Sequence, residues 1–153
     1  VRIAAVGRLR TGPEAALVSD YLERFDRTGR GLGLGPVTQH EVEAKKGGMA
    51  AEAELLSRAI GPADPICILD ERGKLMTSPD FAGQLARWRD QGRAEVAFVI
   101  GGADGLDPSL RARADLSLSF GKMVWPHLLV RVMLSEQLYR AASILAGSPY
   151  HRA

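Results

Sequence analysis

Two kinds of segment alternate along the chain. Short apolar runs that stop at glycine or polar residues predict strands at 2–6, 37–43, 66–69, 96–100 and 116–120. Longer segments with apolar residues at helical spacing predict helices after Pro13, after Gly48, from Pro79, near Pro108 and over 128–146. This order predicts an α/β fold, with a mainly parallel sheet and helices on both of its faces.

The boundary between the third strand and the helix that follows it can be predicted more closely. The strand is expected to end at Leu69, and the polar stretch DERGKLMT, residues 70–77, is expected to form a loop. Ser78 is then the expected N-cap, because its hydroxyl can accept from a free amide of the first turn. Pro79 suits the first helical position, where its missing N–H costs nothing.

Size and composition indicate one domain. With 153 residues and 46% hydrophobic content, the chain is expected to form a single domain, 1–153, with its own core. The formal net charge of +2 leaves room only for a local basic patch. Cys67 lies in an apolar run and is expected to be a packed thiol in a reducing compartment. No membrane-length apolar run or signal-peptide pattern occurs, so we expect a cytoplasmic protein without membrane contact.

Several common catalytic patterns are missing from the sequence. The glycines of GLGLGP have the wrong spacing for a dinucleotide-binding loop, and neither a P-loop nor a nucleophile-elbow motif occurs. His40, His127 and His151 lack the spacing of a zinc site, so no metal is expected. Dinucleotide, P-loop, serine-hydrolase and zinc chemistry are therefore not supported.

The residues that follow the third, fourth and fifth strands are the candidates for a ligand site. Ligands of open α/β sheets bind beyond the carboxyl ends of the strands, and here those ends read LDERGK, IGGADG and GKMVWPH. Glycines such as Gly101 and Gly102 let a ligand approach the main chain. A plain tight turn is the alternative for this glycine-rich loop.

The last helix and the tail after it carry unusual side chains. Apolar residues occupy most of the helix circumference, which predicts burial on a second side, in a subunit interface or as a central helix of a monomer. Glu136 and Arg140 are spaced to pair, whereas Arg131 has no partner within the helix. The helix is followed by Tyr150, His151 and Arg152. Chain termini are usually frayed, so an aromatic, an imidazole and a guanidinium in a row there suggest a functional role.

Four strings taken together resemble one family over almost the whole chain. PHLLVRVMLSEQLYRAASILAGSPYHRA, IGGADGL, LDERGK and the opening VGRLR are similar to the RlmH family, the SPOUT-class methyltransferases that act on pseudouridine in large-subunit ribosomal RNA. Many relatives have Pro-Glu where this chain has Ala103-Asp104, and GKMVW matches only loosely. The resemblance implies a C-terminal trefoil knot, bound S-adenosylmethionine and a homodimer.

The resemblance also implies roles for particular residues. The cofactor would be held, largely by main-chain groups, at Leu69, Gly101, Gly102, Gly121, Lys122, Met123, Val124, Trp125 and Pro126. Methyl transfer needs alignment and exclusion of water, without a metal or a covalent intermediate. Arg131 and Arg152 would steady negative charge on the base, His151 or His127 would take the N3 proton, and Tyr150 would stack on or position the base. The tail of one subunit would close over the pocket of the other.

Binding to ribosomal RNA also requires phosphate contacts. The candidates are basic residues expected in loops or turns: Arg8, Arg10, Lys45, Lys46 and Lys74. Two alternatives stay open at this point. One is a SPOUT methyltransferase that acts on another RNA base, and the other is a non-catalytic nucleotide-binding factor in ribosome assembly.

Overall fold

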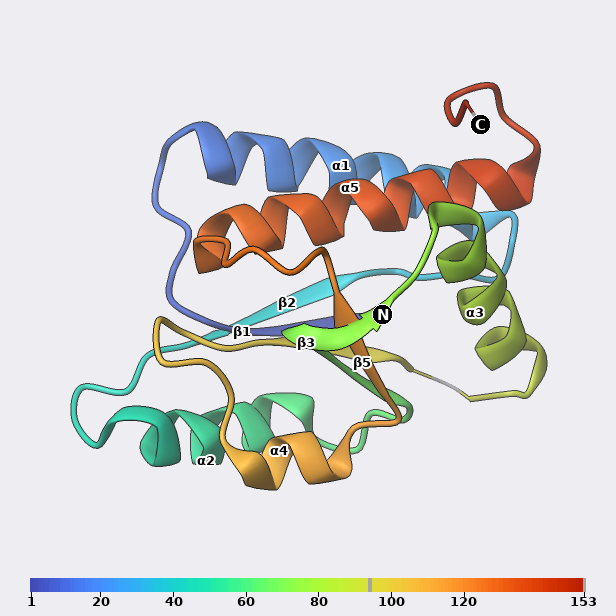
Figure 1. The fold of residues 1–153 in the computed structure, drawn as a ribbon. Coiled ribbons are helices and arrows are strands. Elements are labelled where there is room, and N and C mark those ends of the chain that lie inside the picture. Colours follow the sequence, from blue (N-terminus) through green and yellow to red (C-terminus); the bar gives the residue numbers. More distant parts are fainter. Residues whose placement is uncertain (94, 153) are drawn as a thin grey trace.

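A computed structural model describes residues 1–93 and 95–152 and contains one parallel sheet (Figure 1). The five strands are β1 (Arg2–Val6), β2 (Thr38–Val42), β3 (Ile66–Leu75), β4 (Ala97–Ile100) and β5 (Leu116–Ser119). They are arranged in the order β2-β1-β4-β3-β5, and every pair of neighbours is parallel. The prediction of a mainly parallel α/β sheet is confirmed. The trefoil knot stays a prediction, because strand order alone does not define it.

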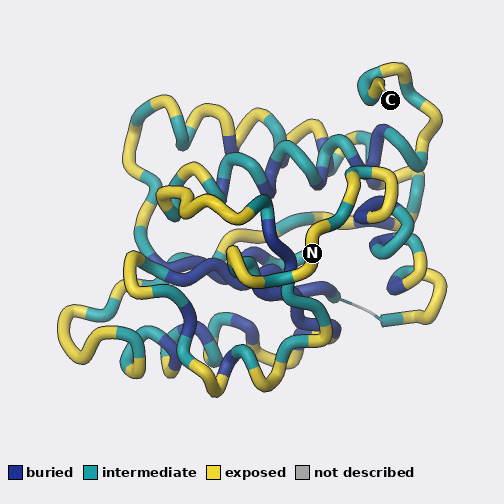
Figure 2. The backbone as a smooth tube through the Cα atoms, in the orientation of Figure 1, coloured by how far each residue is buried: buried dark blue, intermediate teal, exposed yellow. Residues whose placement is uncertain are grey.

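Helices cover both faces of the sheet. They are α1 (Pro13–Arg30), α2 (Gly48–Ile60), α3 (Ser78–Asp90), α4 (Pro108–Arg113) and α5 (His127–Ala146). Helices α1, α3 and α5 lie on one face, and α2 and α4 lie on the other (Figure 1). The central strands β1 and β4 are largely buried between these two layers, each helix buries residues on its inner side, and most loops are exposed or partly exposed (Figure 2). None of the described helices is both long and apolar enough to cross a bilayer.

Strand β4 is the centre of the core. All four of its residues are buried, because helices cover both of its faces and strands flank both of its edges. Phe98 packs with Phe81 of α3 on one side, and Val99 lies in the cluster with α2 on the other. Cys67 of the neighbouring strand is fully buried, so the expectation of a packed thiol is confirmed. Burial, helped by the nearby Asp115 charge, raises the pKa of this thiol.

Two of the predicted boundaries are wrong. The stretch 70–75 is not a loop, because β3 continues through it to Leu75 and pairs again with β5 after a register shift between Leu69 and Lys74. The N-cap of α3 is Thr77, whose hydroxyl accepts from Asp80 N at 3.1 Å, and Ser78 already belongs to the helix. The Ser78 hydroxyl donates instead to Gln137 Oε1 of α5 at 2.7 Å.

Helix α5 explains its broad apolar surface by lying between two other helices. It packs against α1 on one side and α3 on the other, above the sheet (Figure 1). Leu134, Leu138 and Ala142 are fully buried in this arrangement, whereas Leu129 stays 41% exposed near the start of the helix. The position of α5 between two helices of the same chain therefore accounts for burial of most of its apolar side chains. Some apolar surface stays exposed at the N-terminal end of the helix.

An ion pair between a buried arginine and a partly buried glutamate fixes the first turns of α5 to the sheet. Arg131 is only 1% exposed, and its guanidinium pairs with Glu41 of β2. The same guanidinium donates to Gly7 O, just past the end of β1, at 2.8 Å. Glu41 also accepts from Leu9 N at 2.7 Å. One side chain thus connects α5 to the ends of two strands.

The Glu41 carboxylate is stabilised in its charged form. Burial acts to raise the pKa of Glu41, but the hydrogen bond from Leu9 N and the pairing with Arg131 outweigh it, so the pKa lies below its ordinary value. A depressed carboxyl pKa adds stability that is present above the pKa of the unfolded chain. That stability is lost as the pH falls through the folded pKa.

We predict that Glu41→Gln lowers the free energy of unfolding by about 2 kcal/mol at neutral pH, because it leaves a buried guanidinium without a counter-charge. Urea unfolding at pH 7 and in acid measures the effect. The deficit should begin to shrink as the pH falls below the ordinary Glu pKa of 4.5, and it should vanish only as the pH falls through the lower pKa of the folded state, where the wild-type carboxylate is itself protonated.

Glu43→Gln is the matched control, because Glu43 pairs with Arg8 in an exposed salt bridge. Its loss should cost less than about 0.5 kcal/mol. Equal losses for the two variants would contradict a structural role for the buried pair.

Candidate active site

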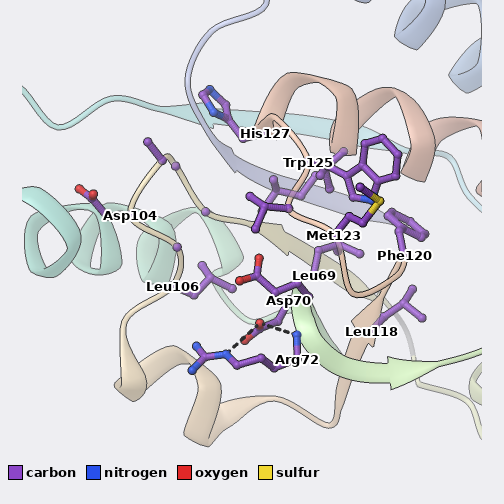
Figure 3. Close-up of a pocket in the computed structure, with 18 of the residues that line it drawn as sticks. Leu69, Asp70, Arg72, Asp104, Leu106, Leu118, Phe120, Met123, Trp125 and His127 are labelled. Atoms are coloured by element: carbon purple, nitrogen blue, oxygen red, sulfur yellow. Dashed lines mark hydrogen bonds and ion pairs between the residues drawn. The ribbon is translucent and has the colours of Figure 1, made fainter.

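A cavity of about 380 Å³ lies beyond the carboxyl ends of β3, β4 and β5. Three segments enclose it: the end of the regular part of β3, the glycine-rich loop after β4 and the loop from β5 to α5 (Figure 3). Its lining includes seven of the predicted cofactor residues, namely Leu69, Gly101, Gly102, Gly121, Met123, Val124 and Trp125. The three segments chosen from the strand ends therefore enclose one cavity, and their role in cofactor binding stays a prediction. Lys122 and Pro126 lie in the same loop and are exposed, outside the lining.

The glycine-rich loop owes its shape to the absence of side chains. A Cβ at Gly101 would lie 2.7 Å from Gly105 O, and a Cβ at Gly102 would lie 3.1 Å from Glu52 Oε2 of α2. The turn is closed by Gly105 N, which donates to Gly102 O at 3.0 Å. The protein's own atoms occupy the places that these side chains would need, so the loop can close this tightly only with glycine, and its glycines line the cavity.

The loop from β5 to α5 forms the apolar wall. Phe120, Met123, Val124 and Trp125 line the cavity, and Met123 and Val124 are 73% and 76% exposed. Ser119, which is buried, anchors the loop, because its hydroxyl accepts from Gly121 N at 3.0 Å and lies 3.0 Å from Glu71 O. The wall is therefore fixed at its base and open toward solvent.

The sequence did not reveal a group of ion pairs around Asp70 in the lining of the cavity. Asp70, whose side chain is only 9% exposed, pairs with Arg111 of α4 at 3.1 Å and with Arg72 at 3.6 Å. Figure 3 shows Asp70 and Arg72 near Leu69, with dashed lines from the Asp70 carboxylate. Arg111 also donates to Leu106 O at 3.2 Å, so it connects the glycine-rich loop to β3. The aspartate of the LDERGK motif was the only available signal, and its partner 41 positions later could not be read from the sequence.

The two predicted catalytic residues near the start of α5 have different positions. His127 lines the cavity, and its Nε2 would lie 3.2 Å from a Cβ placed on Gly7. Arg131 is one helical turn further on but points into the fold toward Glu41. The prediction that Arg131 donates directly to the base does not fit this geometry, because a guanidinium that is 1% exposed cannot reach a ligand.

The tail residues Tyr150, His151 and Arg152 lie at the other end of α5. A helix of 20 residues is about 30 Å long, so the tail is far from the cavity of its own chain (Figure 1). Tyr150 packs edge-on against Tyr139, with ring centroids 4.6 Å apart, and Arg140 lies over the Tyr150 ring at 4.8 Å. His151 Nδ1 lies 3.1 Å from Arg140 Nη1.

The candidate phosphate contacts lie mainly at the same edge of the sheet as the cavity. Arg8, Arg10, Lys45 and Lys46 are exposed in the segments that follow β1 and β2, and Arg8 pairs with Glu43 at 3.1 Å. Lys74 is also exposed, but it lies in β3 and not in a loop as expected. Among the described residues, no group of three His, Cys, Asp or Glu side chains is placed to hold a metal ion.

Comparison with known proteins decides the family. A family model described as predicted SPOUT methyltransferase matches residues 1–151. The chain belongs to the SPOUT methyltransferase family. Curated relatives that are named ribosomal RNA large subunit methyltransferase H support the assignment. Those of Ruegeria pomeroyi and Dinoroseobacter shibae are 69% and 67% identical to this chain, and each match covers 99% of this chain and 98% of the relative.

Solved structures share the fold at low sequence identity. A probable methylase family protein from Haemophilus influenzae superposes with a TM-score of 0.59 at 12% identity, covering 99% of this chain and 70% of that one. A probable methyltransferase from Bordetella pertussis superposes with a TM-score of 0.54 at 12% identity, covering 92% and 95% of the two chains. These likenesses show that the two proteins share the α/β fold of this chain.

The cavity fits the cofactor that the family uses. S-adenosylmethionine carries an adenine, a polar ribose and a charged methionine part, and the cavity offers an apolar wall at Met123 and Trp125 beside main-chain groups at Gly101 and Gly102. A Cβ at Gly101 would meet the main chain of Gly105, so the tight turn that lines the cavity depends on glycine at that position. Leu69 and Leu106 supply further apolar surface between these two walls.

We predict that Gly101→Ala abolishes measurable binding of S-adenosylmethionine in isothermal titration calorimetry. The new Cβ would meet the backbone carbonyl of Gly105 at 2.7 Å, so the loop must move out of its binding shape. Gly31→Ala is the control, because nothing lies within 4 Å of that Cβ and the residue has an ordinary helical φ of −74°. Unchanged binding by Gly101→Ala would refute the assignment of this loop to the cofactor.

Proposed function

We propose that this protein transfers a methyl group from S-adenosylmethionine to N3 of a pseudouridine in 23S ribosomal RNA of the large subunit. The observation that carries the proposal is the full-length identity of 65–69% to proteins named ribosomal RNA large subunit methyltransferase H. The cavity at the sheet edge supports it, because the backbone turn and apolar wall suit the family's cofactor. A cytoplasmic location follows from this substrate.

The chain's own residues mainly align and shield the reactants. S-adenosylmethionine supplies a methyl group on a positively charged sulfur. Gly101 and Gly102 would hold the cofactor through main-chain groups, and Trp125 and Met123 would keep water from the reacting atoms. His127 stands at the rim of the cavity, where it can reach a base that enters from solvent.

A homodimer brings the tail to the reaction. Exposed apolar side chains gather near the start of α5 and the pocket loop, including Met123, Val124, Trp125 and Leu129, and a second copy is the partner that would cover them. The tail lies a helix length away from its own cavity. If two copies pack with their α5 helices in opposite directions, each tail reaches the cavity of the other subunit.

The tail then supplies the groups that the cavity itself lacks. As N3 loses its proton, negative charge spreads to the two flanking carbonyl oxygens of the base, and Arg152, which is exposed, would donate to them. Tyr150 would stack on the base. Burial is the largest cause that raises the pKa of Tyr150, and the nearby Glu136 and Tyr21 add smaller effects in the same direction. Tyr150 therefore stays a neutral phenol and does not act as an acid or base.

Phosphate contacts would come from the exposed basic residues along the cavity edge, Arg8, Arg10, Lys45 and Lys46, with Lys74 on β3. With a net charge of only +2, the chain needs such a local surface to hold RNA. We infer that it reads the folded shape of the ribosomal subunit and not a linear sequence.

Labelled S-adenosylmethionine, incubated with ribosomes that lack the N3 methyl group, tests this function. We predict label on one 23S pseudouridine and a loss of at least about 100-fold in kcat/KM for Arg152→Ala, since that variant removes a donor to the developing charge. Free ribosomal RNA and transfer RNA are tested as substrates in parallel assays. Label on another RNA base would favour a different SPOUT specificity, and cofactor binding without label on any RNA would leave only a binding factor.

A mixed dimer tests whether the tail acts across the subunits. Gly101→Ala and Arg152→Ala chains, co-expressed with different tags, are purified as the heterodimer. We predict about half of the wild-type activity per dimer, because one intact cavity then meets one intact tail. A tail that served its own cavity would leave this heterodimer inactive.

A further inference from the structure

The tail histidine is held by an arginine that can only donate. Arg140 Nη1 and His151 Nδ1 lie 3.1 Å apart, within hydrogen-bonding distance. A guanidinium carries five N–H donors and no acceptor. Nδ1 of His151 must therefore be the acceptor in this contact, and an acceptor nitrogen carries no proton.

The arginine itself is fixed from three directions. Its Nε donates to Glu136 Oε1 at 2.6 Å, one helical turn earlier, and its Cζ lies 4.8 Å from the centre of the Tyr150 ring. Tyr150 in turn packs on Tyr139, which stacks with Tyr21 of α1. The hydrogen bond that Arg140 donates to Glu136 raises the pKa of Arg140, so the guanidinium stays charged at any working pH. Because these contacts hold the guanidinium in place, its Nη1 donor points at His151 in a defined direction.

The tautomer decides what the ring can do. In a neutral imidazole one nitrogen donates and the other accepts. With Nδ1 occupied as acceptor, the proton resides on Nε2, and no other described residue makes a hydrogen bond to that nitrogen. The side of the ring that is available to a substrate is therefore an N–H donor, which cannot take up a proton from the base.

We propose that His151 donates a hydrogen bond from Nε2 to a carbonyl oxygen of the target base, and that Arg140 is the positioning residue that fixes this tautomer. The inference rests on the proposed function and deepens it. It also replaces the expectation that His151 accepts the N3 proton. His151 and Arg152 then act alike, as two donors to the carbonyl oxygens that flank N3.

The proton balance follows from this assignment. The N3 proton goes to hydroxide from the solvent before the base is shielded from water in the cavity. The resulting charge is shared by N3 and the two carbonyl oxygens, which Nε2–H and the Arg152 guanidinium stabilise. The N3 electron pair forms the new bond to the methyl carbon, and the electrons of the broken C–S bond stay on sulfur as a neutral thioether. No further acid or base is required.

Substitutions that separate donating from accepting test the proposal. His151→Gln places an amide N–H near the position of Nε2 but cannot act as a base, whereas His151→Leu removes both functions. We expect His151→Gln to keep kcat/KM within about tenfold of wild type and His151→Leu to lose about 100-fold or more. A His151→Gln variant as inactive as His151→Leu would overturn the donor role.

Nitrogen-15 NMR of the free protein reads the tautomer independently of activity. The wild type should show His151 protonated on Nε2 alone at the assay pH. Arg140→Gln should give a mixture of the two tautomers and a lower kcat, because an amide side chain can accept as well as donate a hydrogen bond. Arg58→Gln is the control, because it breaks an equivalent i, i+4 pair with Glu54 on α2, far from the tail. A proton on Nδ1, or on both nitrogens, would overturn the inference. If instead the wild type methylates no ribosomal RNA, the proposed function fails while the tautomer remains a separate result.

Discussion

The buried contact of Arg131 with Glu41 and Gly7 O is the constraint on which the rest of the site depends. It fastens the first turns of α5 to the ends of β1 and β2, and so it also sets where the preceding loop, with Met123 and Trp125, must lie. A charge placed this deep is expensive unless it is paired and hydrogen-bonded, and here it is both. The residue that first looked like a donor to the substrate is thus the one that holds the surrounding structure together.

Much of the fold could be predicted from the chain because local physics decides it. Pro13 and Pro108 mark helix starts through the missing N–H, and the unbroken apolar run at 96–100 marks a strand buried on both faces. The continuation of β3 through charged residues was missed, because edge pairing with β5 depends on a distant segment. The cap at Thr77 was misplaced by one residue for a similar reason: Thr77 and Ser78 both have hydroxyls, and only the backbone geometry chooses between them.

The cavity was predictable and its charged contacts were not. Strand ends and glycines locate Leu69, Gly101 and Gly102, since parallel strands bring their carboxyl ends to one edge. The partners of Arg131 and Asp70 lie 90 and 41 positions away in the sequence, so no spacing rule could pair them. The Glu136–Arg140 pair was predicted from helical spacing, yet its contact with the tail was not.

Helix α5 sets the distance and the angle between Arg131, which fixes the cavity end, and Arg140, which holds the tail. Each residue of a helix advances it by about 1.5 Å and turns it by about 100°. One extra residue between Arg131 and Arg140 would leave the cavity end seated but swing Tyr150 and His151 toward a different side of the helix. Surface loops can lengthen without such a cost. The number of residues from Arg131 to Arg140 is therefore a fixed dimension of this protein, and a single insertion there would do more harm than most substitutions.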